Sequence, residues 1–136
     1  MRPLRVLIDT NVLVSGVLFG GVPEDILDAA RTGSIIGVVS LHILGEFRDV
    51  LTRPRFGVDI ALADALAEEV ADFCEVVAVE RAAASWSRDA DDDPVVEAAI
   101  LAGADVVVTG DEHLLALELR APRFVTPAAL AAELDR

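Results

Sequence analysis

Short apolar runs rich in branched side chains recur along the chain and alternate with segments that repeat apolar residues at helical spacing. A continuous apolar run of this kind is typical of a strand buried on both faces of a parallel sheet. We interpret as strands the runs 5–8, 35–39, 76–79, 105–109 and 123–125, and as helices the segments 24–31, 41–52, 59–75, 94–102, 113–119 and 127–134. These repeated strand and helix units predict an α/β fold, a three-layer α/β/α sandwich around a central parallel sheet of about five strands.

Length and composition favour a single soluble domain over residues 1–136, because no repeat, low-complexity tract or linker divides the chain. No uncharged run reaches the roughly 18 apolar residues of a membrane span, and the stretch 12–23 is interrupted by glycines and ends in a proline. Asp9 interrupts the first apolar run, so we expect no signal peptide and predict a cytoplasmic location.

The basic, acidic and cysteine residues exclude several classes of site. Cys74 is the only cysteine, which rules out an internal disulfide and a cysteine-based metal site, and we expect it to pack with the helix around 70–73. All eleven basic residues are arginine, so a P-loop and Schiff-base chemistry are excluded. A net charge of −13 argues against a DNA-binding module, but a nucleic-acid enzyme stays possible where bound cations invert the local potential.

Acidic residues gather at the predicted carboxyl edge of the sheet. Asp9 directly follows the first strand, Asp111 lies just beyond the fourth, and Glu46 borders the apolar face of the helix that follows the second. A fourth acidic position precedes the helix 94–102 and consists of the aspartates Asp89, Asp91, Asp92 and Asp93. Four acidic positions at one edge of a parallel sheet are difficult to explain by surface solvation alone.

Each of these residues taken singly also has an alternative structural role. Asp9 could form an Asx turn and Asp111 could cap the helix that follows it. Glu46 could form a surface ion pair with Arg48 or Arg53. These alternatives stay open at the level of the sequence.

Carboxylates gathered in this way are suited to binding hard cations. Two of them about 4 Å apart repel by roughly 4 kcal/mol at an effective dielectric constant near 20, so the group stays ionised when cations lie between its members. Oxygen ligands favour Mg²⁺ or Mn²⁺ over zinc. A carboxylate-held pair of such ions serves in-line hydrolysis of a phosphodiester, in which one ion activates water and the other stabilises the leaving oxygen.

Four stretches of the sequence resemble the motifs of PIN-domain nucleases. They are Leu7-Ile-Asp-Thr-Asn-Val12, the segment 40–46 with the trailing 50–56, Asp89-Ala-Asp-Asp-Asp-Pro-Val-Val-Glu-Ala-Ala99 and Ala104-Asp-Val-Val-Val-Thr-Gly-Asp-Glu-His-Leu114. They occur in the right order and span nearly the whole chain. Within that family the chain is most similar to the VapC-like toxin components of toxin–antitoxin systems.

The resemblance implies a Mg²⁺- or Mn²⁺-dependent endoribonuclease that forms a homodimer and is inhibited by a small antitoxin. It implies metal ligands, which are also the catalytic residues, at Asp9, Glu46, one of Asp92 or Asp93, and Asp111. Asn11 and Thr109 would orient these ligands. A housekeeping PIN nuclease in RNA processing, or a catalytically silent PIN-like scaffold that binds a partner, is the alternative.

Three further residues are candidates for contact with RNA. Arg53 and Arg55 form the densest basic point of the chain and could bind phosphates, although ion pairs with the many acids are about as plausible. His113 follows the fourth strand closely enough to touch a substrate, and a solvated helix start is the alternative. We assign His42 to packing or surface, and Trp86 to the core or an interface rather than to stacking on a base.

Receiver and haloacid-dehalogenase-like domains also place an aspartate after the first strand of a parallel sheet. Each needs a second carboxylate close by and usually a lysine later in the chain. Here Asn11 stands at the position of the second carboxylate and lysine is absent, so both classes are disfavoured.

The aspartate cluster yields a test of which neighbour binds metal. Pro94 is favoured at the first helical position, so we expect Asp93 to cap the helix and Asp92 to be the metal ligand. The Asp92→Asn variant should lose RNA cleavage, whereas Asp93→Asn should mainly lose stability, by a few tenths to about 1 kcal/mol, the value of a carboxylate at a helix N-terminus. Cleavage assays and thermal melts of the two variants measure this, and the reverse pattern would exchange the roles.

Overall fold

The computed structural model describes residues 2–78 and 93–135, with the side chain of Asp93 outside that description. In chain order the elements are β1 (Leu4–Ile8), α1 (Thr10–Leu18), α2 (Gly21–Thr32), β2 (Ile35–Ser40), α3 (Leu41–Thr52), α4 (Ile60–Phe73), β3 (Cys74–Val77), α5 (Asp93–Leu101), β4 (Val106–Val108), α6 (Glu112–Leu115), β5 (Arg123–Val125) and α7 (Pro127–Leu134). None of the helices within these ranges has the length and apolar character that a bilayer crossing requires.

The five strands form one parallel sheet in the order β3-β2-β1-β4-β5. The first two crossovers move outward from β1 to β2 and β3, whereas the third returns to the other side of β1. The strand order therefore reverses between β1 and β4. In open parallel sheets, ligands bind beyond the carboxyl ends of the strands at such a reversal.

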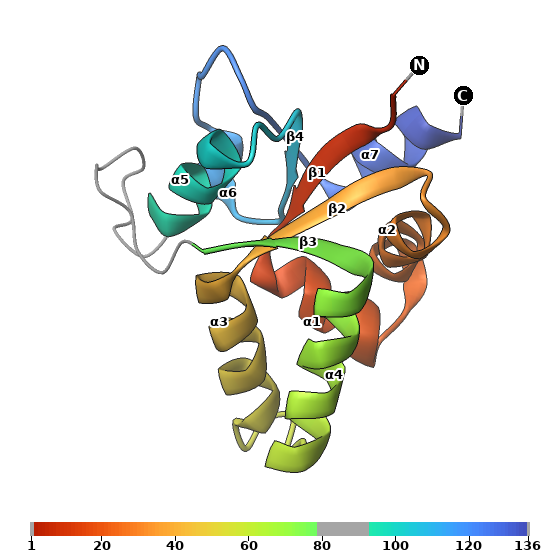
Figure 1. Ribbon diagram of the computed structural model, residues 1–136, viewed down its shortest axis with the longest axis vertical. Helices are drawn as coiled ribbons and strands as arrows, with labels where there is room; N and C mark the ends of the chain where they lie inside the picture. The colour runs from red at the N-terminus through yellow and green to blue at the C-terminus, as the bar shows by residue number, and fades with distance from the viewer. Residues whose placement is uncertain (1, 79–92, 136) are drawn as a thin grey trace.

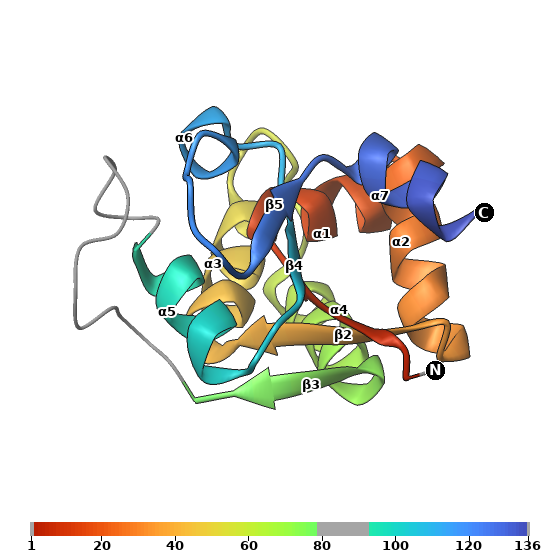
Figure 2. The same cartoon turned by 90° about the horizontal axis from the view of Figure 1, so that it is seen from above.

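Helices cover both faces of this sheet, as the predicted three-layer sandwich requires (Figures 1 and 2). One layer is contiguous, since α1 packs against α2 and α3, α3 against α4, and α2 against α7. The helix α5 contacts β2 from the opposite face. Both α1 and α3 begin at the carboxyl ends of their strands and run side by side away from the sheet (Figure 1).

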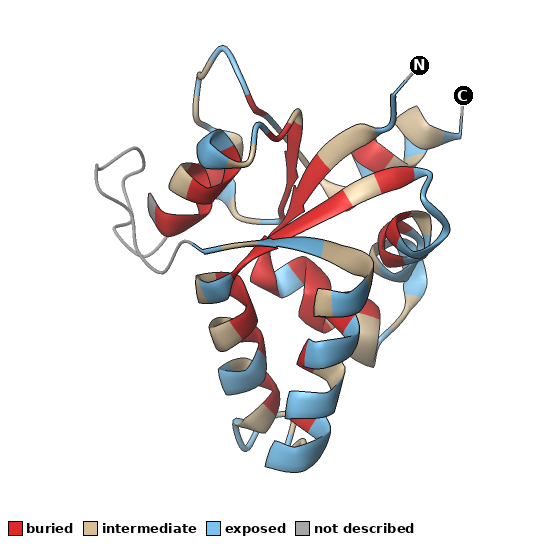
Figure 3. Ribbon diagram, in the orientation of Figure 1, coloured by how far each residue is buried: buried red, intermediate tan, exposed pale blue. Residues whose placement is uncertain are grey.

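The core is centred on β1 and β4, the middle strands of the sheet (Figure 3). The side chains of residues 6–8 on β1 and 106–108 on β4 are completely buried. Both faces of these strands are covered, which explains why the sequence shows continuous runs of valine, leucine and isoleucine there instead of alternation.

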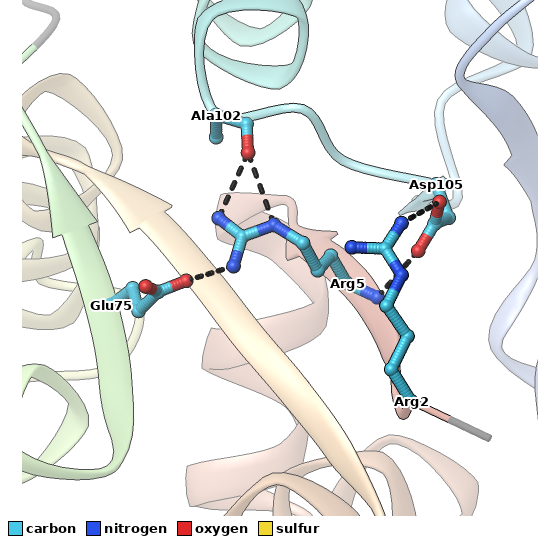
Figure 4. Close-up of polar contacts among 5 residues, drawn as sticks. All are labelled: Arg2, Arg5, Glu75, Ala102 and Asp105. Carbon is cyan, nitrogen blue, oxygen red and sulfur yellow. Dashed lines mark hydrogen bonds and ion pairs between the residues drawn. The ribbon is translucent and has the colours of Figure 1, made fainter.

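The end of the sheet opposite the acidic edge is held by a cluster around Arg5 (Figure 4). The Arg5 guanidinium donates two hydrogen bonds to the carbonyl oxygen of Ala102, at 3.1 and 2.8 Å, and pairs with Glu75. The Arg5 backbone N–H donates to the Asp105 carboxylate at 2.9 Å, and Arg2 pairs with the same side chain. These contacts connect β1 with β3 and with the segment that leads into β4.

The predicted fold class and the five-stranded sheet are confirmed, although β3 begins two residues before the predicted strand 76–79, and the helix α1 is missing from the sequence prediction. Its segment contains three valines and Gly16, which have low intrinsic helix propensity. Burial compensates for this, because Val12, Leu13 and Val14 lie in the core. A β-carbon at Gly16 would come within 2.6 Å of Leu27, so α1 and α2 pack too closely for a larger residue.

Two smaller expectations are corrected by the structure. The predicted helix 113–119 is the shorter α6, which ends at Leu115. Cys74 begins β3 and caps α4 instead of lying on the helix. Burial raises the pKa of its thiol to about 12, so Cys74 is a neutral packing residue.

Gly37 in the middle of β2 gives a test of this packing. A β-carbon there would lie 2.8 Å from Cys74 Sγ and 3.1 Å from the β-carbon of Ala30. We expect Gly37→Ala to destabilise the fold by about 1–3 kcal/mol in urea unfolding, because the buried neighbours have to shift.

Gly45 is the matched control, since a β-carbon there meets nothing within 4 Å inside α3. Gly45→Ala should be stabilising by about 0.5–1 kcal/mol, the usual gain at a helix interior. Equal effects of the two substitutions would contradict the packing of β3 and α2 onto β2.

Candidate active site

The predicted acidic residues meet where the strand order reverses. β1 and β4 pair with Ile8 opposite Val108, so the residues that follow them, Asp9 and Thr109, leave the sheet together. The Asp9 backbone N–H still donates to the Val108 carbonyl oxygen at 3.1 Å. The first residue beyond each central strand is thus polar and buried at the position where ligands bind in such sheets.

The Asp9 carboxylate is held from two sides and is only 6% exposed. Its Oδ1 accepts a hydrogen bond from the Thr10 backbone N–H at 2.8 Å, which makes Asp9 the N-cap of α1. Its Oδ2 accepts from the Thr109 hydroxyl at 2.7 Å, and Thr109 is completely buried. Both oxygens therefore have fixed directions.

Glu46 is joined to Asp9 through Thr10, a residue that the sequence interpretation did not select. The Thr10 hydroxyl donates to Glu46 Oε1 at 2.7 Å, while the Thr10 backbone contacts Asp9. His42 Nε2 lies 3.6 Å from the same Glu46 oxygen, one turn earlier on α3. The alternative pairing of Glu46 with nearby arginines is not seen, since Arg48 and Arg53 pair with other acids.

Asp111 lies on the other side of Thr109. Its backbone N–H donates to Thr109 Oγ1 at 3.0 Å, and its carboxylate caps α6 by accepting from the His113 backbone N–H at 2.7 Å. The capping role that the sequence left open for Asp111 is therefore present. Only one carboxylate oxygen is used in it, and the side chain is half-buried.

The carboxylates are close enough to influence one another. Burial raises the pKa of Asp9, while the hydrogen bonds from Thr109 and from the Thr10 backbone lower it. The negative charges of Glu46 and Asp111 raise this pKa further. The three acids thus form one electrostatic unit around Asp9, and a cation would relieve their repulsion.

The complete set of predicted metal ligands is not described by the structure. Asp92 and the side chain of Asp93 lie outside the described residues. The helix α5 begins at Asp93, one residue before the predicted start, so Asp93 is the first helical residue and not the predicted N-cap. Within residues 2–78 and 93–135, no group of three or more histidine, cysteine, aspartate or glutamate side chains is arranged to hold a metal ion. The donors that are present, carboxylates beside threonine hydroxyls, are of the chemical type that Mg²⁺ and Mn²⁺ prefer.

The remaining predicted site residues lie further out. Asn11 is exposed, and the hydrogen bonds to the Asp9 carboxylate come from Thr10 and Thr109 instead. Asn11 lines a hollow together with Arg53 and Arg55. His113 is exposed at the start of α6, and Trp86 lies outside the described residues.

Comparison with known proteins agrees with this architecture. The family model described as "PIN domain" matches residues 5–113. The chain belongs to the PIN domain family. No curated protein sequence matches it significantly.

A solved structure with the same fold is the VapBC2 complex from Rickettsia felis, bound to a DNA fragment from its promoter. The match has a TM-score of 0.61 and 10% sequence identity, and it covers 90% of this chain and 97% of that one. The aligned part thus includes most of the PIN domain described above, and at this identity the similarity is one of fold.

The burial of Asp9 in this PIN domain predicts a pH-dependent effect of its removal. In metal-free buffer at neutral pH, Asp9→Asn should be as stable as the wild type or more stable, because asparagine keeps the capping oxygen and carries no charge. The pKa of Asp9 in the folded protein is raised from its ordinary value of 3.8. Below pH 3.8 the carboxyl group is protonated in both states and does not destabilise the fold, and the destabilisation is complete once the pH has risen through the folded-state pKa. The stability gap should therefore widen with pH in urea titrations.

The exposed Glu68 on α4 provides the control for this comparison. Glu68→Gln should change the free energy of unfolding by no more than about 0.5 kcal/mol, as is usual for a surface substitution. A large fall in melting temperature for Asp9→Asn would instead assign Asp9 a purely structural role.

Proposed function

We propose that the protein is a metal-dependent endoribonuclease that hydrolyses RNA phosphodiester bonds. The observation that carries the proposal is the buried Asp9 carboxylate, held rigidly at the strand reversal with Glu46 and Asp111 beside it. Membership of the PIN domain family, whose members are nucleases, supports the reaction class. The resemblance of the sequence motifs to VapC-like proteins supports RNA as the substrate.

The proposed metal ligands are Asp9, Glu46, Asp111 and one of Asp92 or Asp93. When bound, Mg²⁺ or Mn²⁺ would activate the attacking water and stabilise the leaving oxygen. The chain itself supplies orientation, because Thr109 and the Thr10 backbone hold the two oxygens of Asp9, and the Thr10 hydroxyl holds Glu46. Fixing the directions of Asp9 and Glu46 in this way lowers the conformational cost of binding a cation.

We further propose that the protein is the toxin of a type II toxin–antitoxin pair. The fold shared with a VapBC2 complex and the motif resemblance support this role over a housekeeping nuclease. A net charge of −13 favours a basic antitoxin segment as the inhibitor, since complementary charge speeds and specifies association.

The proposal includes a single cytoplasmic domain that forms a homodimer. Ile60 and Leu62, which are 70% and 52% exposed on α4, offer apolar surface for the second copy. Apolar side chains of this size are typical of homodimer contacts.

The nuclease proposal predicts cleavage of single-stranded RNA by the purified protein with Mg²⁺ or Mn²⁺, and no cleavage after EDTA treatment. Asp9→Asn should reduce the cleavage rate by at least about 10²-fold, because a ligand of the proposed ions is lost. The control Glu68→Gln should cleave like the wild type. A gel assay of labelled RNA measures the rate, and calorimetry with Mn²⁺ measures metal binding independently of activity. Absence of both cleavage across diverse RNAs and metal binding would refute the proposal.

A further inference from the structure

A hollow between α1 and the end of α3 with the segment that follows it combines aromatic rings with hydrogen-bond donors. We name it the α1/α3 hollow, and its functional residues are Asn11, Ser15, Phe19, Arg53, Arg55 and Phe56. Its volume is about 280 Å³, close to the lower limit of small-molecule sites, so it can take one ring system and not an extended peptide.

The aromatic part of the hollow is unusually open. Phe19 is 69% exposed although it is a large apolar side chain. Its ring contacts Phe56 with a centroid distance of 6.0 Å and a tilt of 58°, so Phe56 supports one side of it. An exposed ring fixed in this way is a platform on which a flat π-system can stack.

Arg55 stands out among the arginines of this acidic chain. Of the eight arginines in residues 2–78 and 93–135, six form ion pairs with carboxylates, and Arg55 and Arg120 form none with a described residue. Its guanidinium carbon instead lies 5.2 Å from the centre of the Phe56 ring. The neighbouring Arg53 has only a long contact of 3.9 Å to the exposed Asp49, which stabilises little. Both guanidinium groups are thus available to an anion.

The hollow lies on the two helices that begin at the acidic edge of the sheet. Asn11 lies in the first turn of α1, two residues after Asp9, and Asn11, Ser15 and Phe19 follow one face of the helix at four-residue spacing. Arg53 is the C-cap of α3 and lies seven residues after Glu46. The two helices lie side by side (Figure 1), so a chain bound along them would pass from the carboxylates to the rings.

From this arrangement we infer that the α1/α3 hollow binds one unpaired nucleotide of the substrate RNA, with its base stacked on Phe19 and its phosphate held by Arg55 and Arg53. This inference rests on the proposed ribonuclease function and extends it to single-stranded RNA adjacent to the cleaved bond. An exposed ring beside Arg55, which has no ion pair among the described residues, and the weakly paired Arg53 matches the combination of base and phosphate. A basic protein partner, expected for a chain of charge −13, would be repelled by the two arginines.

The test measures RNA affinity in the Asp9→Asn background, which keeps the RNA intact. Fluorescence anisotropy with a labelled single-stranded RNA of mixed sequence should show binding weakened about 5- to 150-fold by Phe19→Ala, the effect of removing one base–aromatic stack. Phe19→Trp should retain the affinity of the parent. Arg55→Ala should reduce the slope of log affinity against log salt by about 0.7, the value for one phosphate contact on a single strand.

Two control variants match these substitutions in type and exposure. Leu101, 65% exposed on α5, is the apolar control, and Arg120, also exposed and without an ion pair among the described residues, is the charge control. Leu101→Ala and Arg120→Ala should bind RNA like the parent. Thermal melts of all variants separate loss of fold from loss of contact.

The outcomes distinguish this inference from the function on which it rests. If the wild type cleaves RNA and the Phe19 and Arg55 variants bind RNA like the controls, the nucleotide site is refuted and the ribonuclease stands. Unchanged RNA binding with loss of antitoxin binding would assign the hollow to a protein partner and overturn the inference. A wild type that neither binds nor cleaves RNA would refute both proposals.

Discussion

Burial of an ionisable carboxylate opposes folding unless the charge is hydrogen-bonded or neutralised. Asp9 is such a buried carboxylate, so the surrounding fold has to supply hydrogen-bond donors to both of its oxygens. One oxygen is satisfied by the first turn of α1, and the other by Thr109 at the end of β4. The first partner is local in the chain, whereas the second depends on the pairing of β1 with β4, which brings the residues that follow the two strands together. The strand order and the start of α1 thus together determine the direction of the carboxylate.

The same condition connects stability with function. Hydrogen bonds from Thr10 and Thr109 offset part of the desolvation of Asp9, but the neighbouring charges of Glu46 and Asp111 act in the opposite direction. Without a bound cation, the three neighbouring carboxylates make the fold less stable than uncharged side chains at the same positions would. Groups of like charge kept together in this way are typical of functional sites, where some stability is given up for activity.

Much of the fold could be predicted from the sequence because the strands β1, β2 and β4 are buried on both faces and show as continuous apolar runs. The structure confirms the predicted helices 41–52 and 127–134, whose first turns are capped by the side chains of Ser40 and Thr126. The helix α1 could not be predicted, since its valines and Gly16 favour other conformations and only tertiary packing makes it helical. Local propensity is overridden where burial is complete.

The acidic residues of the site were equally visible, because Asp9 directly follows a strand and Asp111 lies just beyond another. Their connecting residue, Thr10, was not, since one hydroxyl in the sequence gives no sign of a partner 36 positions away on α3. The hollow was hidden for a similar reason. Phe19 and Arg55 are far apart in the chain, and only the packing of α1 against α3 brings them together.

The Thr109 hydroxyl has one proton, and its two contacts determine where that proton points. Its oxygen accepts from the Asp111 backbone N–H, so the proton is directed at Asp9. The result is a one-way chain of hydrogen bonds from the start of α6, through a buried side chain, to the central carboxylate. Hydrogen bonds arranged in series polarise one another. A backbone movement that lengthens the hydrogen bond from the Asp111 N–H would therefore change the basicity of the Asp9 carboxylate. The loop after β4 is therefore electrostatically coupled to the end of β1, although Asp9 and Asp111 cap different helices.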